Sequence, residues 1–134
     1  MTFGDLGVEL SALVGATALL LVLVLVQATA GVMAQGLMAM AGSRDNLPPP
    51  KTFQARMLRV VDNHREGLIM FAPLALVGAA ANQFDAQSAL GAQIFLWSRV
   101  AHAVLYIAAV PLVRPLAWAA GLVGTGMVLV SLIQ

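Results

Sequence analysis

Residues 56–77 read RMLRVVDNHREGLIMFAPLALV, a charged stretch that runs directly into an apolar one. Its first half repeats polar side chains at helical spacing: Arg56, Arg59, Asn63 and Glu66. On a helix these side chains share one face, within about 80° of each other. An ionised side chain at membrane depth costs about 2.5 to 3.5 kcal/mol, so such groups usually pair inside a bundle or line a cavity. The pattern indicates a functional face, while Arg56 and Arg65 would also suit a helix end whose arginines reach water.

The composition is that of an integral membrane protein. Of the 134 residues, 60% are hydrophobic and only 10% are charged, whereas soluble domains carry about 25% charged residues. The length suits a single domain over residues 1–134. A net charge of +1 gives no basis for a nucleic-acid partner. Without cysteine there are no disulfides or thiolate metal sites, and no metal-ligand spacing occurs, so a reactive thiol would have to arrive with a ligand.

Four segments long enough to cross a bilayer as helices alternate with loops, since about 20 predominantly apolar residues make one crossing, and the first of these segments is uncharged over residues 10–42. We expect helices over about residues 8–41, 53–81, 89–110 and 116–133. Pro48, Pro49 and Pro50 end any helix in the first loop. Asp5 and Glu9, rather than basic residues, precede the first run, which argues against a signal peptide. The predicted fold class is therefore an all-α, four-helix transmembrane bundle.

The third expected helix carries a polar face of its own, formed by Arg99, His102 and Tyr106. Measured from the second loop at 1.5 Å per residue, Glu66 lies roughly 28 Å along its helix, His102 roughly 25 Å and Tyr106 roughly 32 Å. The two polar faces thus stand at the same depth. A lone membrane histidine is more often structural than a ligand, so both interpretations of His102 stay open.

The basic residues of the loops predict the orientation. The first loop and its flanks hold Arg44, Lys51 and Arg56, and the third turn holds Arg114, whereas the second loop holds none. The positive-inside rule then places loops one and three in the cytoplasm and both termini outside it. In a bacterium this would be a multi-pass protein of the inner membrane. The polar faces would lie in the cytoplasmic half.

The chemistry of these faces indicates the kind of ligand. Arginine side chains suit carboxylate or phosphate groups, which they bind through two parallel hydrogen bonds. Glu66 would hold an amine or orient an arginine. The fitting ligand is a small, multiply charged molecule that works beside an apolar partner drawn from the membrane lipid.

The same residues carry a resemblance to a known family. Arg56-x-x-Arg59-x-x-x-Asn63-x-x-Glu66 resembles the second-helix signature of the MAPEG family, the membrane-associated proteins in eicosanoid and glutathione metabolism. Residues 99–106, RVAHAVLY, are similar to the family's third-helix segment. The loop 43–50, SRDNLPPP, resembles that of the bacterial branch. Four spans and this length also fit, so the resemblance covers nearly the whole chain.

The resemblance implies a homotrimer that binds glutathione between neighbouring subunits near the cytoplasmic side. It implies that the glutathione-binding residues are Arg56, Arg59, Asn63, Glu66, Arg99, His102 and Tyr106. Arg114 matches the family's arginine proposed to stabilise the glutathione thiolate, with Tyr106 in support. A nearby cation lowers the pKa of a thiol and raises its nucleophilic fraction.

Two departures bear on the activity. The position before Asn63, basic in some eicosanoid-forming members, is Asp62, and Arg114 is followed by Pro115 instead of a hydroxyl residue. Both weaken an eicosanoid synthase assignment. We therefore expect a glutathione-dependent transferase or peroxidase that acts on lipophilic electrophiles.

Two other classes of protein stay open. A non-catalytic lipid-binding scaffold of the same family would bind a hydrophobic molecule without turnover. A small four-helix multidrug exporter should carry an acidic residue in the middle of its first helix, where this chain has only Glu9 at the rim.

Overall fold

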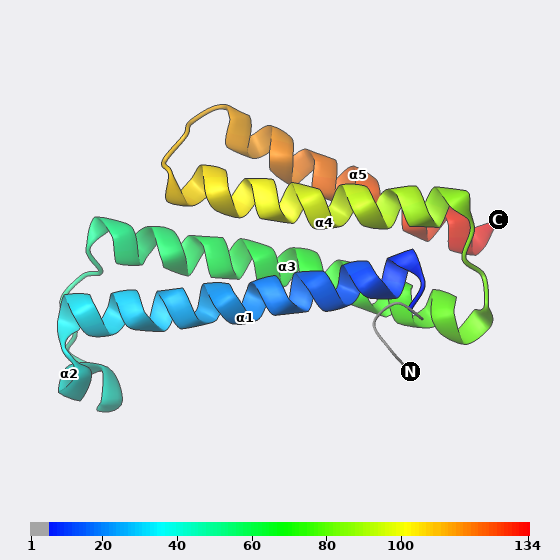
Figure 1. Cartoon of the computed structure of the whole chain (residues 1–134). Coiled ribbons are helices and arrows are strands. Elements are labelled where there is room, and N and C mark those ends of the chain that lie inside the picture. The colour runs from blue at the N-terminus through cyan, green and yellow to red at the C-terminus, as the bar shows by residue number, and fades with distance from the viewer. Residues whose placement is uncertain (1–5) are drawn as a thin grey trace.

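The computed structural model describes residues 6–134, and every regular element within that range is a helix. The elements in order are α1 (Val8–Gln35), α2 (Leu37–Ala41), α3 (Thr52–Ala81), α4 (Ala86–Ile107) and α5 (Val113–Ile133). Figure 1 shows the long helices α1, α3, α4 and α5 lying side by side, with α2 as a short hook at the end where α1 finishes and α3 begins. The all-helical prediction is confirmed.

Three of the helices are long and apolar enough to cross a membrane: α1, α4 and α5. Helix α3 has 30 residues and is also of membrane length. It differs from the others because charged side chains crowd its first half, between Arg56 and Glu66. By length and composition three helices are therefore candidate spans, and the fourth span stays a prediction.

The first helix is shorter than the sequence suggested. A continuous helix over 8–41 is wrong, because the chain turns at Gly36, whose φ is +91°. Only glycine adopts such a backbone conformation at little cost. The N–H of Gly36 still bonds to the carbonyl of Val32 at 2.8 Å, closing the end of α1 before α2 starts.

Helix α4 covers residues 86–107 instead of the expected 89–110, and a capping box explains its earlier start. The Asp85 carboxylate accepts a hydrogen bond from the Ser88 N–H at 2.7 Å, and the Ser88 hydroxyl accepts one from the Asp85 N–H at 2.9 Å. Such reciprocal bonds satisfy donors that a helix start leaves unpaired. The Ser88 N–H also lowers the pKa of the Asp85 carboxyl below its ordinary value. The Ser88 hydroxyl in turn donates to the carboxylate of Glu9, which joins α4 to the start of α1.

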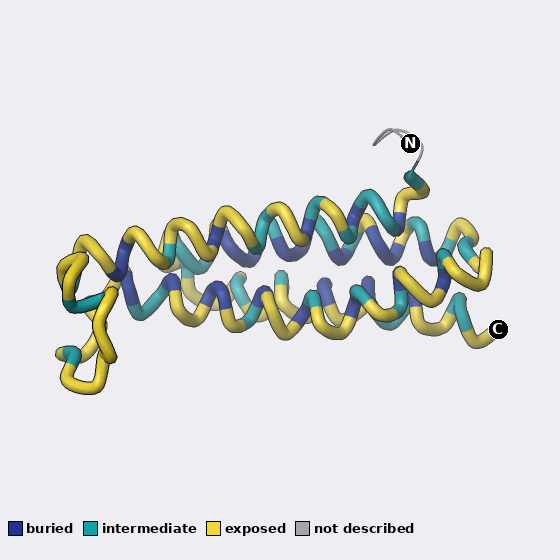
Figure 2. The backbone as a smooth tube through the Cα atoms, turned by 90° about the horizontal axis from the view of Figure 1, so that it is seen from below, coloured by how far each residue is buried: buried dark blue, intermediate teal, exposed yellow. Residues whose placement is uncertain are grey.

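Small and aromatic side chains bring the helices together. Phe71 of α3 and Phe95 of α4 stack with their ring centroids 4.1 Å apart. Helices α4 and α5 meet at Gly91 and Gly124, where a Cβ built on Gly124 would lie 2.5 Å from the Gly91 carbonyl oxygen. Figure 2 shows the buried residues turned toward the middle of the bundle and the exposed ones outward. The outward side chains include large apolar ones such as Leu21, which suits a lipid-facing surface.

Candidate functional site

The polar faces of α3 and α4 contact each other, partly at the surface of the bundle, as two faces at the same depth could do. Arg59 Nε donates a hydrogen bond to the Tyr106 hydroxyl at 2.9 Å. Arg99 Nη1 donates to Asn63 Oδ1 at 3.0 Å. Each bond joins a residue of α3 to one of α4. The two stripes of the sequence therefore form one polar cluster.

Tyr106 is the centre of this cluster. The guanidinium carbon of Arg114 lies 4.4 Å from the centroid of the Tyr106 ring, and that of Arg59 lies 5.9 Å from it. The His102 ring packs against the same phenol, with centroids 5.5 Å apart. Cations near an aromatic ring face are attracted by its quadrupole. The phenol thus stands between arginines from α3 and α5, which creates a positive site beside a hydroxyl group.

A tight turn brings Arg114 to this position. The turn between α4 and α5 places Leu112 at a φ of 66° and bonds the Val113 N–H to the Pro111 carbonyl at 2.8 Å. Arg114 then sits in the first turn of α5. In Figure 1 this turn lies at the same end of the bundle as α2 and the start of α3. The first and third loops therefore share one end, as the predicted orientation requires.

Arg99 is buried in a slot between three helices, with 3% of its surface exposed. Besides Asn63, its guanidinium donates to the Trp118 carbonyl of α5 at 3.4 Å. Two glycines make the space: a Cβ on Gly67 would lie 3.2 Å from Arg99 Nη1, and one on Gly121 would lie 2.7 Å from Nη2. Within residues 6–134 no partner reaches Arg99 Nε. The residue therefore points into its own chain.

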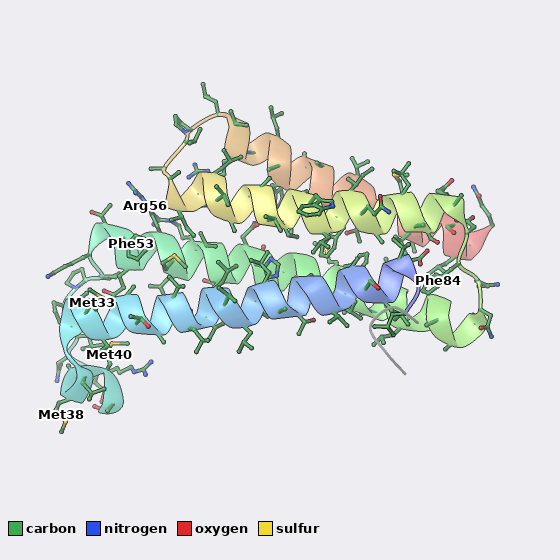
Figure 3. All side chains as sticks on the ribbon, viewed as in Figure 1. Met33, Met38, Met40, Phe53, Arg56 and Phe84 are labelled. Carbon is green, nitrogen blue, oxygen red and sulfur yellow. The ribbon has the colours of Figure 1, made fainter. Side chains whose placement is uncertain are left out.

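Two other site candidates lie apart from these contacts. Glu66 is exposed and Arg56 is half-buried, and neither forms a hydrogen bond or ion pair with another of the described residues. Figure 3 places Arg56 at the α2 end of the bundle, far from Phe84 at the other end. Both side chains are thus free to bind a ligand or a neighbouring subunit.

Two other charged residues of α3, Asp62 and Arg65, pair with each other. Arg65 forms an ion pair with Asp62 at 2.8 Å, and about 60% of each side chain is exposed. Pairs this exposed contribute little to stability. The Asp62 departure from the family pattern is therefore satisfied locally and takes no part in the polar cluster.

His64 is a buried residue that the sequence analysis did not single out. Its Nε2 lies 2.8 Å from the Ala16 carbonyl oxygen of α1, and because a carbonyl only accepts, this nitrogen carries the proton. His64 thus fastens α3 to α1. In the sequence, the burial of His64 could have been predicted from its helical spacing with the apolar residues Met57, Val60 and Phe71, which are buried on the same side of α3.

Two clefts open at the α2 end of the molecule. One of about 700 Å³ lies between α1, α2, the proline loop and α3, with Gln35 and Gln54 among its lining residues. Another of about 480 Å³ is lined mainly by apolar side chains, with Lys51 at its edge. Neither cleft is lined by Arg59, Asn63 or Tyr106. The clefts are therefore separate from the polar cluster.

The comparisons with known proteins agree with the motifs. The family model described as the MAPEG family matches residues 12–134. No match was found among curated proteins or among solved structures. Together with the three described helices that are long and apolar enough to cross a membrane, the family match identifies an integral membrane protein. Because the match covers nearly the whole chain, the protein belongs to the MAPEG family.

Proposed function

We propose that the protein is a membrane-bound transferase or peroxidase that uses glutathione against lipophilic electrophiles. The observation that carries the proposal is the cluster around Tyr106, in which Arg59 and Arg114 bring two cations to one phenol. An anionic, thiol-bearing ligand matches such a cluster, and the chain itself has no cysteine. The family includes proteins that use glutathione.

The exposed part of the α3 stripe would bind the ligand. Arg59 and Arg56 suit the two carboxylates of glutathione, and Glu66 suits its amino group. In this proposal Asn63 donates hydrogen bonds from its amide, while the buried Arg99 and His102 support the site from within. The exposed position of Arg59 and Glu66 also favours a second chain covering them. We therefore include a homotrimer, with glutathione between subunits, in the proposal.

Arg114 would act on the sulfur. A free thiol has a pKa near 8.5, and a neighbouring guanidinium favours the thiolate. In the transferase reaction the thiolate forms a carbon–sulfur bond, the leaving group departs with its electron pair, and the thiol proton passes to water. In the peroxidase reaction the thiolate attacks the terminal peroxide oxygen, so that the O–O bond breaks, the sulfur becomes a sulfenic acid and the other oxygen leaves as the alcohol after taking up a proton. A second glutathione then attacks the sulfenic sulfur, which forms the disulfide and releases water. The Tyr106 hydroxyl lies beside this position and would donate a hydrogen bond to the sulfur.

Glutathione binding is the first test. Arg59→Ala should weaken glutathione affinity about ten-fold or more, because a charge-assisted hydrogen bond is worth about 1.5 to 3 kcal/mol. Arg65→Ala is the matched control, since Arg65 lies on another face of α3 and pairs with Asp62. Calorimetry on the purified protein measures both. If the unchanged protein shows no binding, the transferase proposal is wrong.

A lipid-binding scaffold without catalysis is the second candidate, and the two clefts at the α2 end favour it. Their volumes of about 700 and 480 Å³ and their apolar walls would suit a hydrophobic molecule. Turnover of a lipophilic electrophile with glutathione separates the candidates. An exporter is less well supported, because Glu9 lies at the start of α1 and is bound to Ser88.

The orientation gives a further prediction. Both termini should lie outside the cytoplasm, because the basic residues of the loops gather at the end of the bundle that holds the first and third loops. Two reporters fused after Gln134, one active only in the cytoplasm and one active only outside, measure this. If only the cytoplasmic reporter is active, the orientation of the protein is the opposite of the predicted one.

A further inference from the structure

We infer that Arg99 is a positioning residue, which fixes the Asn63 amide so that its N–H donors face the glutathione site. The inference rests on the proposed function and assigns Arg99 an indirect part in binding. It separates Arg99 from Arg59, although both were expected to bind the ligand.

Arg99 is held entirely from within its own chain. Its guanidinium contacts Asn63 of α3 and the Trp118 carbonyl of α5, and its slot exists because Gly67 and Gly121 carry no side chain. Only 3% of the residue is exposed in a single chain. A second subunit can only cover it further. Arg99 therefore offers no free guanidinium to a ligand bound on the open surface.

The contact with Arg99 determines how the Asn63 amide is oriented. Guanidinium groups only donate, so the Asn63 atom facing Arg99 at 3.0 Å has to be the carbonyl oxygen. The amide nitrogen then points away from Arg99. Asn63 is half-buried and shares its helical face with the exposed Arg59 and Glu66. The two N–H donors of Asn63 are thus directed to the face where an anionic ligand would bind.

The charge of Arg99 adds to this effect. Among residues 6–134 the structure contains one ion pair, Arg65 with Asp62, so no carboxylate neutralises the buried guanidinium. In a low-dielectric environment, a donor bonded to the amide oxygen polarises the amide and strengthens its N–H groups as donors. Arg99 would therefore both orient Asn63 and raise its attraction for a carboxylate.

A double-mutant cycle tests the indirect role. Asn63→Ala and Arg99→Met should each weaken glutathione binding by about ten-fold. The double variant should bind no more weakly than Asn63→Ala alone, since Arg99 acts through that amide. Calorimetry with reduced glutathione on folded protein in detergent measures all four affinities. A double variant about 100-fold weaker would mean that Arg99 contacts glutathione independently, and the inference would be overturned.

Two milder substitutions keep the test decisive if Arg99→Met does not fold. Asn63→Asp preserves a partner for Arg99 but removes both N–H donors, so glutathione affinity should fall about ten-fold while the folded yield is retained. Gly121→Ala should also weaken binding, because its Cβ would displace Arg99 Nη2. Gly126→Ala is the matched control on α5, since nothing lies within 4 Å of its added Cβ. Unchanged affinity in Asn63→Asp or in Gly121→Ala contradicts the inference.

The cycle also separates this inference from the proposed function. If the unchanged protein does not bind glutathione, the proposed function fails, and the inference that rests on it fails as well. If the unchanged protein binds but the two losses multiply, the proposed function stands and only the positioning role of Arg99 is wrong.

Discussion

Arg114→Leu is expected to lower turnover with glutathione about 100-fold while changing glutathione affinity only a few-fold. In the proposed reaction the thiolate is the reacting species, and Arg114, whose guanidinium carbon lies 4.4 Å from the centroid of the Tyr106 ring, is the cation that would stabilise it. Ground-state binding depends mostly on the carboxylates, which other residues would hold. Steady-state kinetics and calorimetry on the same preparation give the two values. The ultraviolet absorbance of bound thiolate should fall together with turnover.

Arg114 also lies at the end of a membrane helix beside Pro115, where a basic residue serves as a positive-inside anchor. If that were its only role, Arg114→Leu would reduce insertion or yield and leave each folded molecule fully active. Arg114→Lys is the control, because it keeps the charge. Normal turnover per folded molecule in the leucine variant would contradict the catalytic assignment.

Gly124→Ala is expected to destabilise the protein by about 1 to 3 kcal/mol or more, because the added methyl group has nowhere to go. Its Cβ would lie 2.5 Å from the Gly91 carbonyl oxygen and 2.7 Å from the Phe95 nitrogen, both backbone atoms. Helices α4 and α5 would have to separate, which would also move Arg114 from Tyr106. Thermal unfolding in detergent measures the loss.

Gly126→Ala, two residues along the same helix, provides the comparison. Nothing lies within 4 Å of its added Cβ, and alanine is the better helix former, so stability should stay the same or rise slightly. Equal stability of the two variants would show that the close approach at Gly91 and Gly124 does not hold α4 against α5.

Helical periodicity made much of the polar cluster predictable. A fixed rise per residue gives the depth of each side chain, and a fixed rotation gives its face. These two quantities placed the two polar faces at a similar depth, whereas the individual pairs, Arg59 with Tyr106 and Asn63 with Arg99, are seen only in the structure. The family motifs then pointed to the family that the whole-chain match identifies.

Other features depend on backbone conformation or on tertiary contacts that a sequence does not display. Gly36 ends α1 because of its positive φ. The apolar pattern of the sequence continues past Gly36, and hydropathy does not report a backbone dihedral angle. In the sequence His64 is one polar residue among several, and its role in joining α3 to α1 is evident only from its contact with the Ala16 carbonyl. The inward direction of Arg99 depends on Gly67 and Gly121, which come from different helices. The last two features are decided by what a second helix places nearby.

The charged first half of α3 has a consequence for how the protein enters the membrane. Helices α1, α4 and α5 can each insert on their own hydropathy. Helix α3 cannot do so as easily, because each ionised side chain costs about 2.5 to 3.5 kcal/mol at depth. Its polar partners, Arg99 and Tyr106, are on α4 and are synthesised later. A nascent chain that stops before α4 should therefore leave α3 at the bilayer surface, so that biogenesis of the protein waits for the hairpin of α3 and α4 to enter together.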